Sequence, residues 1–138
     1  MRYLIDTNIV VFSVIEHDRI SKEVHHILTD YENQIYVSSE SIKEIFMLLQ
    51  YQKITVPAWK YPHDIFYTIE KEYQFGINYV KKEHLLTFAD LEPMKDHSDP
   101  VDRMIIAQAI TENMPLISSD AKFKYYSRQK LDFIFNDK

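Results

Sequence analysis

Residues 3–8 of the chain are Tyr3-Leu4-Ile5-Asp6-Thr7-Asn8, a short apolar run that ends on an acid. A brief apolar run bounded by turn-forming residues is typical of a buried strand. An aspartate at the carboxyl end of such a strand is removed from water, and a buried charge is costly unless a metal ion or a partner compensates it. The alternative for Asp6 is a helix cap or a turn, because Asp, Thr and Asn all favour those positions.

Further apolar stretches predict strands at residues 35–37, 77–80, 116–117 and 133–135. Helical spacing of apolar residues predicts helices at 21–31, 83–91 and 100–111, and another that begins at Pro62 with Gly76 as its C-terminal stop. Strands that alternate with helices need crossover connections. The sequence therefore predicts an α/β fold with a central, mostly parallel sheet of about five strands flanked by helices. We expect residues 1–138 to form a single domain.

Composition excludes several classes of protein. The chain has no cysteine, which excludes disulfides and cysteine-based zinc sites, and its only glycine, Gly76, excludes glycine-rich nucleotide-binding loops. No apolar stretch approaches the length that spans a bilayer, and no export signal is visible, so we expect a cytoplasmic protein without membrane association. With 21 acidic and 16 basic residues the net charge is −5, so a polyanion must be attracted by a local patch or a bound cation.

Three more acids recur beside later apolar segments. Glu44 lies on the helix expected after the 35–37 strand, Asp102 lies at the start of the 100–111 helix, and Asp120 follows the 116–117 strand. Ligands of open parallel sheets bind beyond the carboxyl ends of the strands, so Asp6, Glu44 and Asp120 are expected at one rim. Carboxylates gathered in this way indicate a divalent-metal site.

Two of these acids belong to largely apolar helices. Glu44 has the spacing of a capping box with Ser41, but its helix is apolar almost all round. Asp102 is placed to compensate a helix dipole, but positions three, four and seven further on form the apolar face of the same helix. Metal ligation is therefore favoured for Asp102.

Two other acids have stronger structural alternatives. Asp99 precedes Pro100, which is typical of a helix cap followed by proline at the first helical position, so Asp99 is assigned to capping. Asp120 precedes residues 121–125 and has capping as its alternative. Its inclusion depends on the convergence of four acids.

In combination, these motifs resemble the PIN-domain family, and within it the VapC-type toxins of bacterial toxin–antitoxin pairs. The resemblance covers nearly the whole chain and is carried by residues 4–8 (LIDTN), 37–45 (VSSESIKEI), 97–109 (HSDPVDRMIIAQA) and 116–120 (LISSD). The segment DPVDR followed by IAQA is the most specific part. Ser118-Ser119 replaces the more usual threonine at the start of the last motif.

The resemblance implies a PIN-like three-layer sandwich and assigns its site. Asp6, Glu44 and Asp102 would be the core metal ligands, Asp120 the fourth acid of the catalytic set, and Ser118 a supporting residue. Thr7 and Asn8 are placed to support the same carboxylates. The implied activity is cleavage of RNA with one or two Mg²⁺ or Mn²⁺ ions, and the implied partner is a small antitoxin. We also expect a homodimer.

Candidate RNA contacts are few in so acidic a chain. A basic cluster follows Asp120 and either contacts the RNA backbone or forms a solvated helix face, and neither alternative is preferred: Lys122, Lys124, Arg128, Lys130. Arg103 either binds phosphate or pairs with a nearby acid, and pairing is favoured.

Histidines and aromatic residues are expected to have structural roles. The histidines lack zinc-ligand spacing and are expected at the surface or in packing: His17, His25, His26, His63, His84, His97. An aromatic stretch favours an antitoxin or dimer surface over base stacking: Tyr51, Trp59, Tyr61, Phe66, Tyr67.

Two other functions compete with the nuclease. A phosphatase with an aspartyl nucleophile would usually have a second aspartate at position 8, where this chain has Asn8. A catalytically inactive PIN-like domain that binds RNA or protein is the other alternative. It gives no physical reason to keep four buried carboxylates.

Overall fold

The computed structural model describes all 138 residues and contains one sheet in which every strand is parallel to its neighbours. The strand order is β3-β2-β1-β4-β5. The strands are β1 (Arg2–Ile5), β2 (Gln34–Ser38), β3 (Gly76–Asn78), β4 (Leu116–Ser118) and β5 (Phe133–Phe135). The predicted α/β fold is confirmed, and the sheet is parallel throughout.

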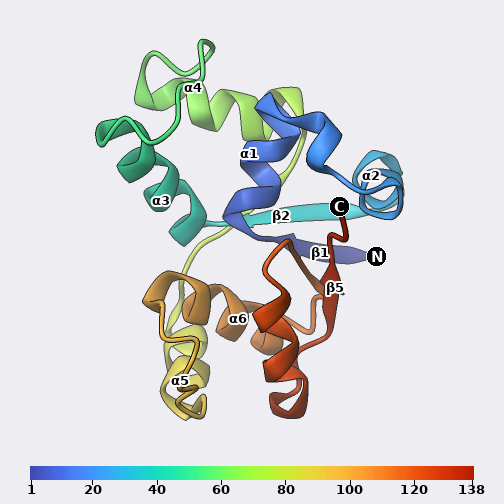
Figure 1. The fold of residues 1–138 in the computed structure, drawn as a ribbon, viewed down its shortest axis with the longest axis vertical. Coiled ribbons are helices and arrows are strands. Elements are labelled where there is room, and N and C mark those ends of the chain that lie inside the picture. Colours follow the sequence, from blue (N-terminus) through green and yellow to red (C-terminus); the bar gives the residue numbers. More distant parts are fainter.

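Helices connect successive strands and cover both faces of the sheet (Figure 1). Between β1 and β2 lie α1 (Thr7–Ile15), the 3₁₀ turn η1 (His17–Arg19) and α2 (Lys22–Thr29); between β2 and β3 lie α3 (Ser39–Gln50), α4 (Pro62–Tyr67) and the π-helical turn η2 (Thr68–Glu72). Between β3 and β4 lie α5 (Lys82–Asp90) and α6 (Pro100–Glu112), and the 3₁₀ helix η3 (Ala121–Gln129) precedes β5. In Figure 1, α1 and α3 lie on one side of the sheet and α5 and α6 on the other.

The two faces of each central strand belong to different cores. Ile5 packs in the cluster with α1, α3 and α4, whereas Leu4 packs with α6 and η3, and both are fully buried. Ile117 and Leu116 of β4 divide in the same way. Burial on both faces explains why the strand sequences are continuously apolar.

Gly76 does not end the helix that precedes it, and that prediction is wrong. The helical segment ends at Glu72, and Gln74 adopts the left-handed conformation with φ 57°. Gly76 instead begins β3 opposite Tyr36, where an added Cβ would lie 2.6 Å from Tyr36 Cε1. Its role is to leave room for the Tyr36 ring, which occupies the space that a side chain at position 76 would fill.

Buried polar bonds hold the carboxyl ends of β2 and β3 against α6. Gln108 is fully buried, accepts a hydrogen bond from Ser38 Oγ, and donates to the Asn78 carbonyl and Oδ1 at 2.9 and 2.8 Å. These bonds fix the start of α3, which Ser38 caps, relative to α6. They thereby fix the two helices that carry Glu44 and Asp102.

No helix of the structure has the length and apolar character needed to cross a membrane.

Candidate metal centre

A cavity of about 410 Å³ opens beyond the carboxyl ends of β1 and β4. The four acids singled out in the sequence all line it: Asp6, Glu44, Asp102, Asp120. Thr7, Asn8 and Asp99 also contribute to its lining. The acids come from the end of β1, from α3, from α6 and from the segment after β4, so the parallel topology brings them together.

Asp6 is buried at the bottom of this cavity and also caps α1. Its Oδ1 accepts a hydrogen bond from Thr7 N at 2.8 Å, and its Oδ2 accepts one from Ser118 Oγ at 2.7 Å. Burial raises the pKa of Asp6 to about 6, with smaller upward contributions from Glu44 and Asp120, while the two hydrogen bonds act in the opposite direction. The predicted cap and the predicted site residue are therefore the same side chain.

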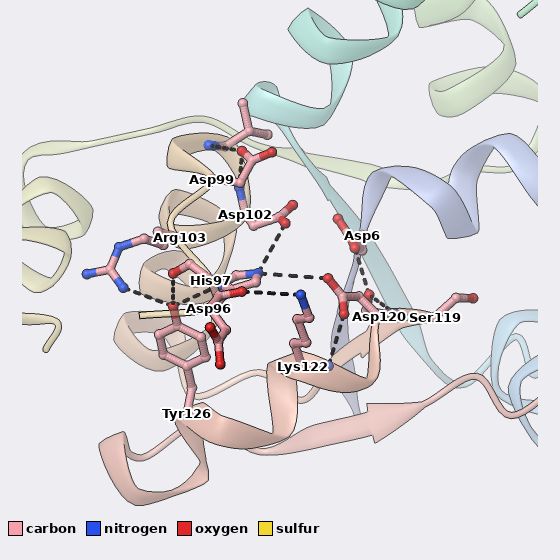
Figure 2. Close-up of polar contacts among 12 residues, drawn as sticks. Asp6, Asp96, His97, Asp99, Asp102, Arg103, Ser119, Asp120, Lys122 and Tyr126 are labelled. Atoms are coloured by element: carbon pink, nitrogen blue, oxygen red, sulfur yellow. Dashed lines mark hydrogen bonds and ion pairs between the residues drawn. The ribbon is translucent and has the colours of Figure 1, made fainter. Parts of the chain in front are cut away.

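Asp102 lies in the first turn of α6, on the side that faces Asp6 (Figure 2). Burial raises the pKa of Asp102 to about 8, and the negative charges of Asp6, Asp99, Glu44 and Asp120 add to the effect. Asp99 caps the helix as predicted, accepting hydrogen bonds from Val101 N at 2.8 Å and from Asp102 N at 3.3 Å. Cap and candidate ligand are thus separated by less than one helical turn.

Asp120 and Glu44 complete the acidic lining. Asp120 caps η3 through Lys122 N at 2.9 Å, and Ser118 Oγ accepts a hydrogen bond from Asp120 N at 3.0 Å, so Ser118 connects Asp6 with Asp120. Glu44 is half-buried and lies beyond the first turn of α3, where Ser38 rather than Glu44 satisfies the helix start. The capping-box alternative for Glu44 is therefore wrong.

The remaining predicted supporting residues hold the walls of the cavity. Thr7 Oγ1 donates to Ser41 Oγ at 2.9 Å and joins α1 to α3, and Asn8 Oδ1 accepts from Ser119 N at 3.4 Å. Both contacts connect the segment after β1 to a neighbouring element of the site.

His97 is a site residue that the sequence did not identify. It is buried, and its Nε2 lies 3.2 Å from Asp102 Oδ2 and 3.8 Å from Asp120 Oδ2 (Figure 2). Burial lowers the pKa of His97. The sequence predicted a surface or packing histidine, and His97 is indeed packed in the interior. Its position between two acids was not predicted, because that position depends on the path of the loop between α5 and α6.

The basic residues are divided between structural and exposed positions. Arg103 forms no ion pair; it donates to the Leu91 and Glu92 carbonyls and to the Tyr126 hydroxyl, so its expected pairing with an acid is wrong. Lys122 is exposed and donates to the Asp96 carbonyl at 3.3 Å. Lys124 is exposed on η3 and lines a different hollow. Contact of these three residues with RNA remains a prediction.

Arg19 is the one basic side chain that lines the acidic cavity, and no sequence pattern pointed to it. Its guanidinium lies 4.1 Å from the centre of the Phe12 ring and 3.7 Å from Glu16 Oε2. Stacking on an aromatic face holds a guanidinium in place while leaving its N–H groups free for an anion.

The donor atoms of the cavity fit a hard divalent cation. No lysine or arginine forms an ion pair with any of the four acids, so no basic side chain neutralises them by direct contact. Single ligand atoms of His97, Asp102 and Asp120 lie within 4.8 Å of one another. Carboxylate oxygens are the ligands that Mg²⁺ and Mn²⁺ prefer.

Comparison with protein families gives one match, to the PIN domain, over residues 3–129. Comparison with curated protein sequences gives no match.

Solved structures with the same fold span the whole chain. The crystal structure of VapBC2 from Rickettsia felis bound to a DNA fragment from their promoter matches with a TM-score of 0.72 and 21% identity, covering 99% of this chain and 100% of that one. VapBC-1 from nontypeable Haemophilus influenzae matches with a TM-score of 0.66 and 16% identity over 100% of both chains. FitAcB from Neisseria gonorrhoeae matches with a TM-score of 0.66 and 17% identity, covering 99% and 97%. At these identities the likeness shows a shared fold.

Proposed function

Because the chain belongs to the PIN-domain family, we propose that it is a divalent-metal-dependent endoribonuclease and the toxin of a toxin–antitoxin pair. The observation that carries the proposal is the single cavity lined by Asp6, Glu44, Asp102 and Asp120, with no lysine or arginine paired to them. Solved relatives in fold are VapBC and FitAB proteins, which supports the toxin–antitoxin assignment. We propose that it acts on RNA in the cytoplasm.

The four acids would hold one or two Mg²⁺ or Mn²⁺ ions. A bound ion supplies charge neutralisation at the scissile phosphate and acidifies a water molecule near neutral pH. Asp6 presents its carboxylate in a fixed orientation because Thr7 N and Ser118 Oγ each hold one oxygen. Asp102 must release its proton before it can ligate a cation, since its pKa of about 8 favours the protonated form at neutral pH.

The substrate phosphate needs a positive charge at the rim of the cavity. We place Arg19 in this role, because it lines the cavity and its only acidic partner, Glu16, is 3.7 Å away at the surface. Lys122 does not line the cavity, but its main-chain N–H donates to Asp120 Oδ1, so it is the better placed of the two lysines predicted to contact RNA. Lys124 and Arg103 are weaker candidates.

The proposed activity is tested by incubating pure protein with single-stranded and structured RNA in Mg²⁺, Mn²⁺ or EDTA. We expect cleavage with either metal, none in EDTA, and at least a hundredfold loss in Asp6→Asn, since the variant removes a ligand charge at the centre of the cluster. Asp30→Asn is the matched control, because Asp30 precedes β2 at the opposite end of the sheet. Equal behaviour of wild type and Asp6→Asn in all three conditions would show that the metal-nuclease assignment is wrong.

The antitoxin would bind an apolar groove between α3 and α4. This groove of about 670 Å³ is lined by Phe46, Leu49, Ile54 and Trp59, and it is flanked by the exposed Tyr61. Ile54 also lines the acidic cavity, so the two hollows share a wall. A partner that fills the groove would reach the acids and block access to them.

Co-expression with the small protein encoded immediately upstream tests this partner. We expect a complex that survives size-exclusion chromatography and suppresses cleavage, and we expect Ile54→Asp to weaken it by placing a charge in the apolar groove. Tyr31→Asp is the control, because Tyr31 is exposed and lines neither the groove nor the acidic cavity. A complex that forms equally well with both variants would place the partner elsewhere.

The expected homodimer stays a proposal. Leu85 and Leu86 of α5 are 53% and 59% exposed, and adjacent exposed leucines offer an apolar surface for a second copy. Light scattering coupled to size-exclusion chromatography is expected to give twice the chain mass. The mass of a single chain would rule the dimer out.

A further inference from the structure

A line of polar contacts runs from Arg103, which is half-buried, to the candidate metal centre (Figure 2). Arg103 Nη1 donates to the Tyr126 hydroxyl at 2.9 Å, that hydroxyl lies 2.8 Å from His97 Nδ1, and His97 Nε2 lies 3.2 Å from Asp102 Oδ2. Tyr126 and His97 are both buried. The line joins η3, the loop after α5 and the first turn of α6.

Arg103 determines which atoms donate and which accept along this line of hydrogen bonds. A guanidinium always donates, so it occupies one lone pair of the Tyr126 oxygen. The hydroxyl proton then has two acceptors within reach, His97 Nδ1 at 2.8 Å and the His97 carbonyl at 3.3 Å, and the nearer one gives the stronger bond. If Nδ1 accepts, the proton of the neutral imidazole resides on Nε2 and points at Asp102.

The opposite tautomer would direct a lone pair at a carboxylate. With Nδ1 protonated, the Nε2 lone pair would lie 3.2 Å from Asp102 Oδ2 and 3.8 Å from Asp120 Oδ2. Two acceptors at that distance repel each other when Asp102 is ionised. The Nε2–H tautomer removes the repulsion and makes a charge-assisted hydrogen bond in its place.

We propose that His97, oriented by Tyr126 and Arg103, is a positioning residue that donates Nε2–H to Asp102 Oδ2 and leaves the other oxygen of Asp102 free for the metal. His97 itself is then not a ligand. Edge-on packing against Phe123 and Tyr126, at centroid distances of 5.2 and 5.3 Å, fixes the plane of the ring. Carboxylate ligands oriented by such a neighbour bind metal more tightly because less freedom is lost on binding.

The tautomer can be measured in the wild-type protein without any assay of activity. Long-range ¹H–¹⁵N correlation spectra of ¹⁵N-labelled protein saturated with Mg²⁺ report which ring nitrogen of His97 is protonated. We expect a proton on Nε2. An unprotonated Nε2 would overturn the proposal and point to His97 as a direct ligand.

The expected effect of His97 on metal affinity is tested by isothermal titration calorimetry with Mg²⁺. We expect His97→Phe, which keeps the ring shape but has no donor, to weaken binding roughly tenfold to a hundredfold, and His97→Gln, which offers an amide N–H, to recover much of the loss. His84→Phe is the matched control: His84 is also buried and paired with an acid, Glu112, but lies outside the cavity. Thermal unfolding checks that each variant folds.

Wild-type Mg²⁺ affinity in His97→Phe would overturn the proposal. The inference rests on the proposed function only in taking Asp102 as a cation ligand. A protein that binds Mg²⁺ with the expected His97 dependence but cuts no RNA would refute the nuclease and leave this role of His97 intact.

Discussion

Asp6 combines two functions in one side chain, and the combination has an energetic cost. The carboxylate caps α1 and faces the cavity, while burial raises its pKa to about 6. A helix cap contributes about 1 kcal/mol, whereas each unit of pKa shift represents about 1.4 kcal/mol. In the absence of metal the ionised Asp6 therefore costs more than its cap contributes.

Arg19 is a second single residue with a large expected effect, because its guanidinium supplies the positive charge in an acidic cavity. We expect Arg19→Ala to raise KM for RNA roughly tenfold, equivalent to about 1.4 kcal/mol, with little change in kcat. Steady-state kinetics on a fluorescent oligoribonucleotide measures both constants. Arg2→Ala is the control, since Arg2 begins β1 at the opposite end of the sheet; an unchanged KM in Arg19→Ala would remove Arg19 from the substrate path.

At the scale of elements, the contact between β2 and β3 depends on a glycine. Gly76 pairs with Tyr36, and an added methyl group would overlap the Tyr36 ring. We expect Gly76→Ala to lower the free energy of unfolding by about 1–3 kcal/mol through this crowding. Urea denaturation followed by circular dichroism measures the loss.

A double-mutant cycle isolates the cause of that loss. In the Tyr36→Leu background the ring is absent, so Gly76→Ala should cost clearly less than in wild type. An equal cost in both backgrounds would mean that the glycine serves the backbone and not the contact with Tyr36.

For the whole molecule, the acidic cluster couples stability to pH and to metal. Folding raises the pKa of Asp6 from 3.8 to about 6 and the pKa of Asp102 from 3.8 to about 8. Between pH 3.8 and about 8 the folded state therefore binds more protons than the unfolded chain. Stability then falls as pH rises, and the fall spans roughly pH 4 to 8. The shifted pKa of Asp6 alone accounts for about 3 kcal/mol of this loss in the free energy of unfolding.

Urea unfolding in EDTA and in saturating Mg²⁺ tests this coupling. We expect the metal-free protein to be less stable at pH 8 than at pH 5, and we expect Mg²⁺ to reverse most of the difference by binding the ionised acids. Asp6→Asn should show a shallower fall in EDTA because one of the titrating groups is gone. A metal-free stability that rises between pH 5 and pH 8 would contradict the expectation.

The sequence by itself predicted five strands, a mostly parallel sheet and most of the helices, although not α1, and it singled out the four acids that line one cavity. These depend on local features: apolar runs set the strands, three- and four-residue spacing set the helices, and the acids stand at fixed offsets from both. The tertiary structure alone decided that His97 contacts Asp102, that Arg19 enters the cavity and that Gly76 faces Tyr36. His97 and Arg19 lie on connections whose path is set by packing against distant elements, and the constraint on Gly76 is a ring from another strand, so no local pattern encodes these contacts.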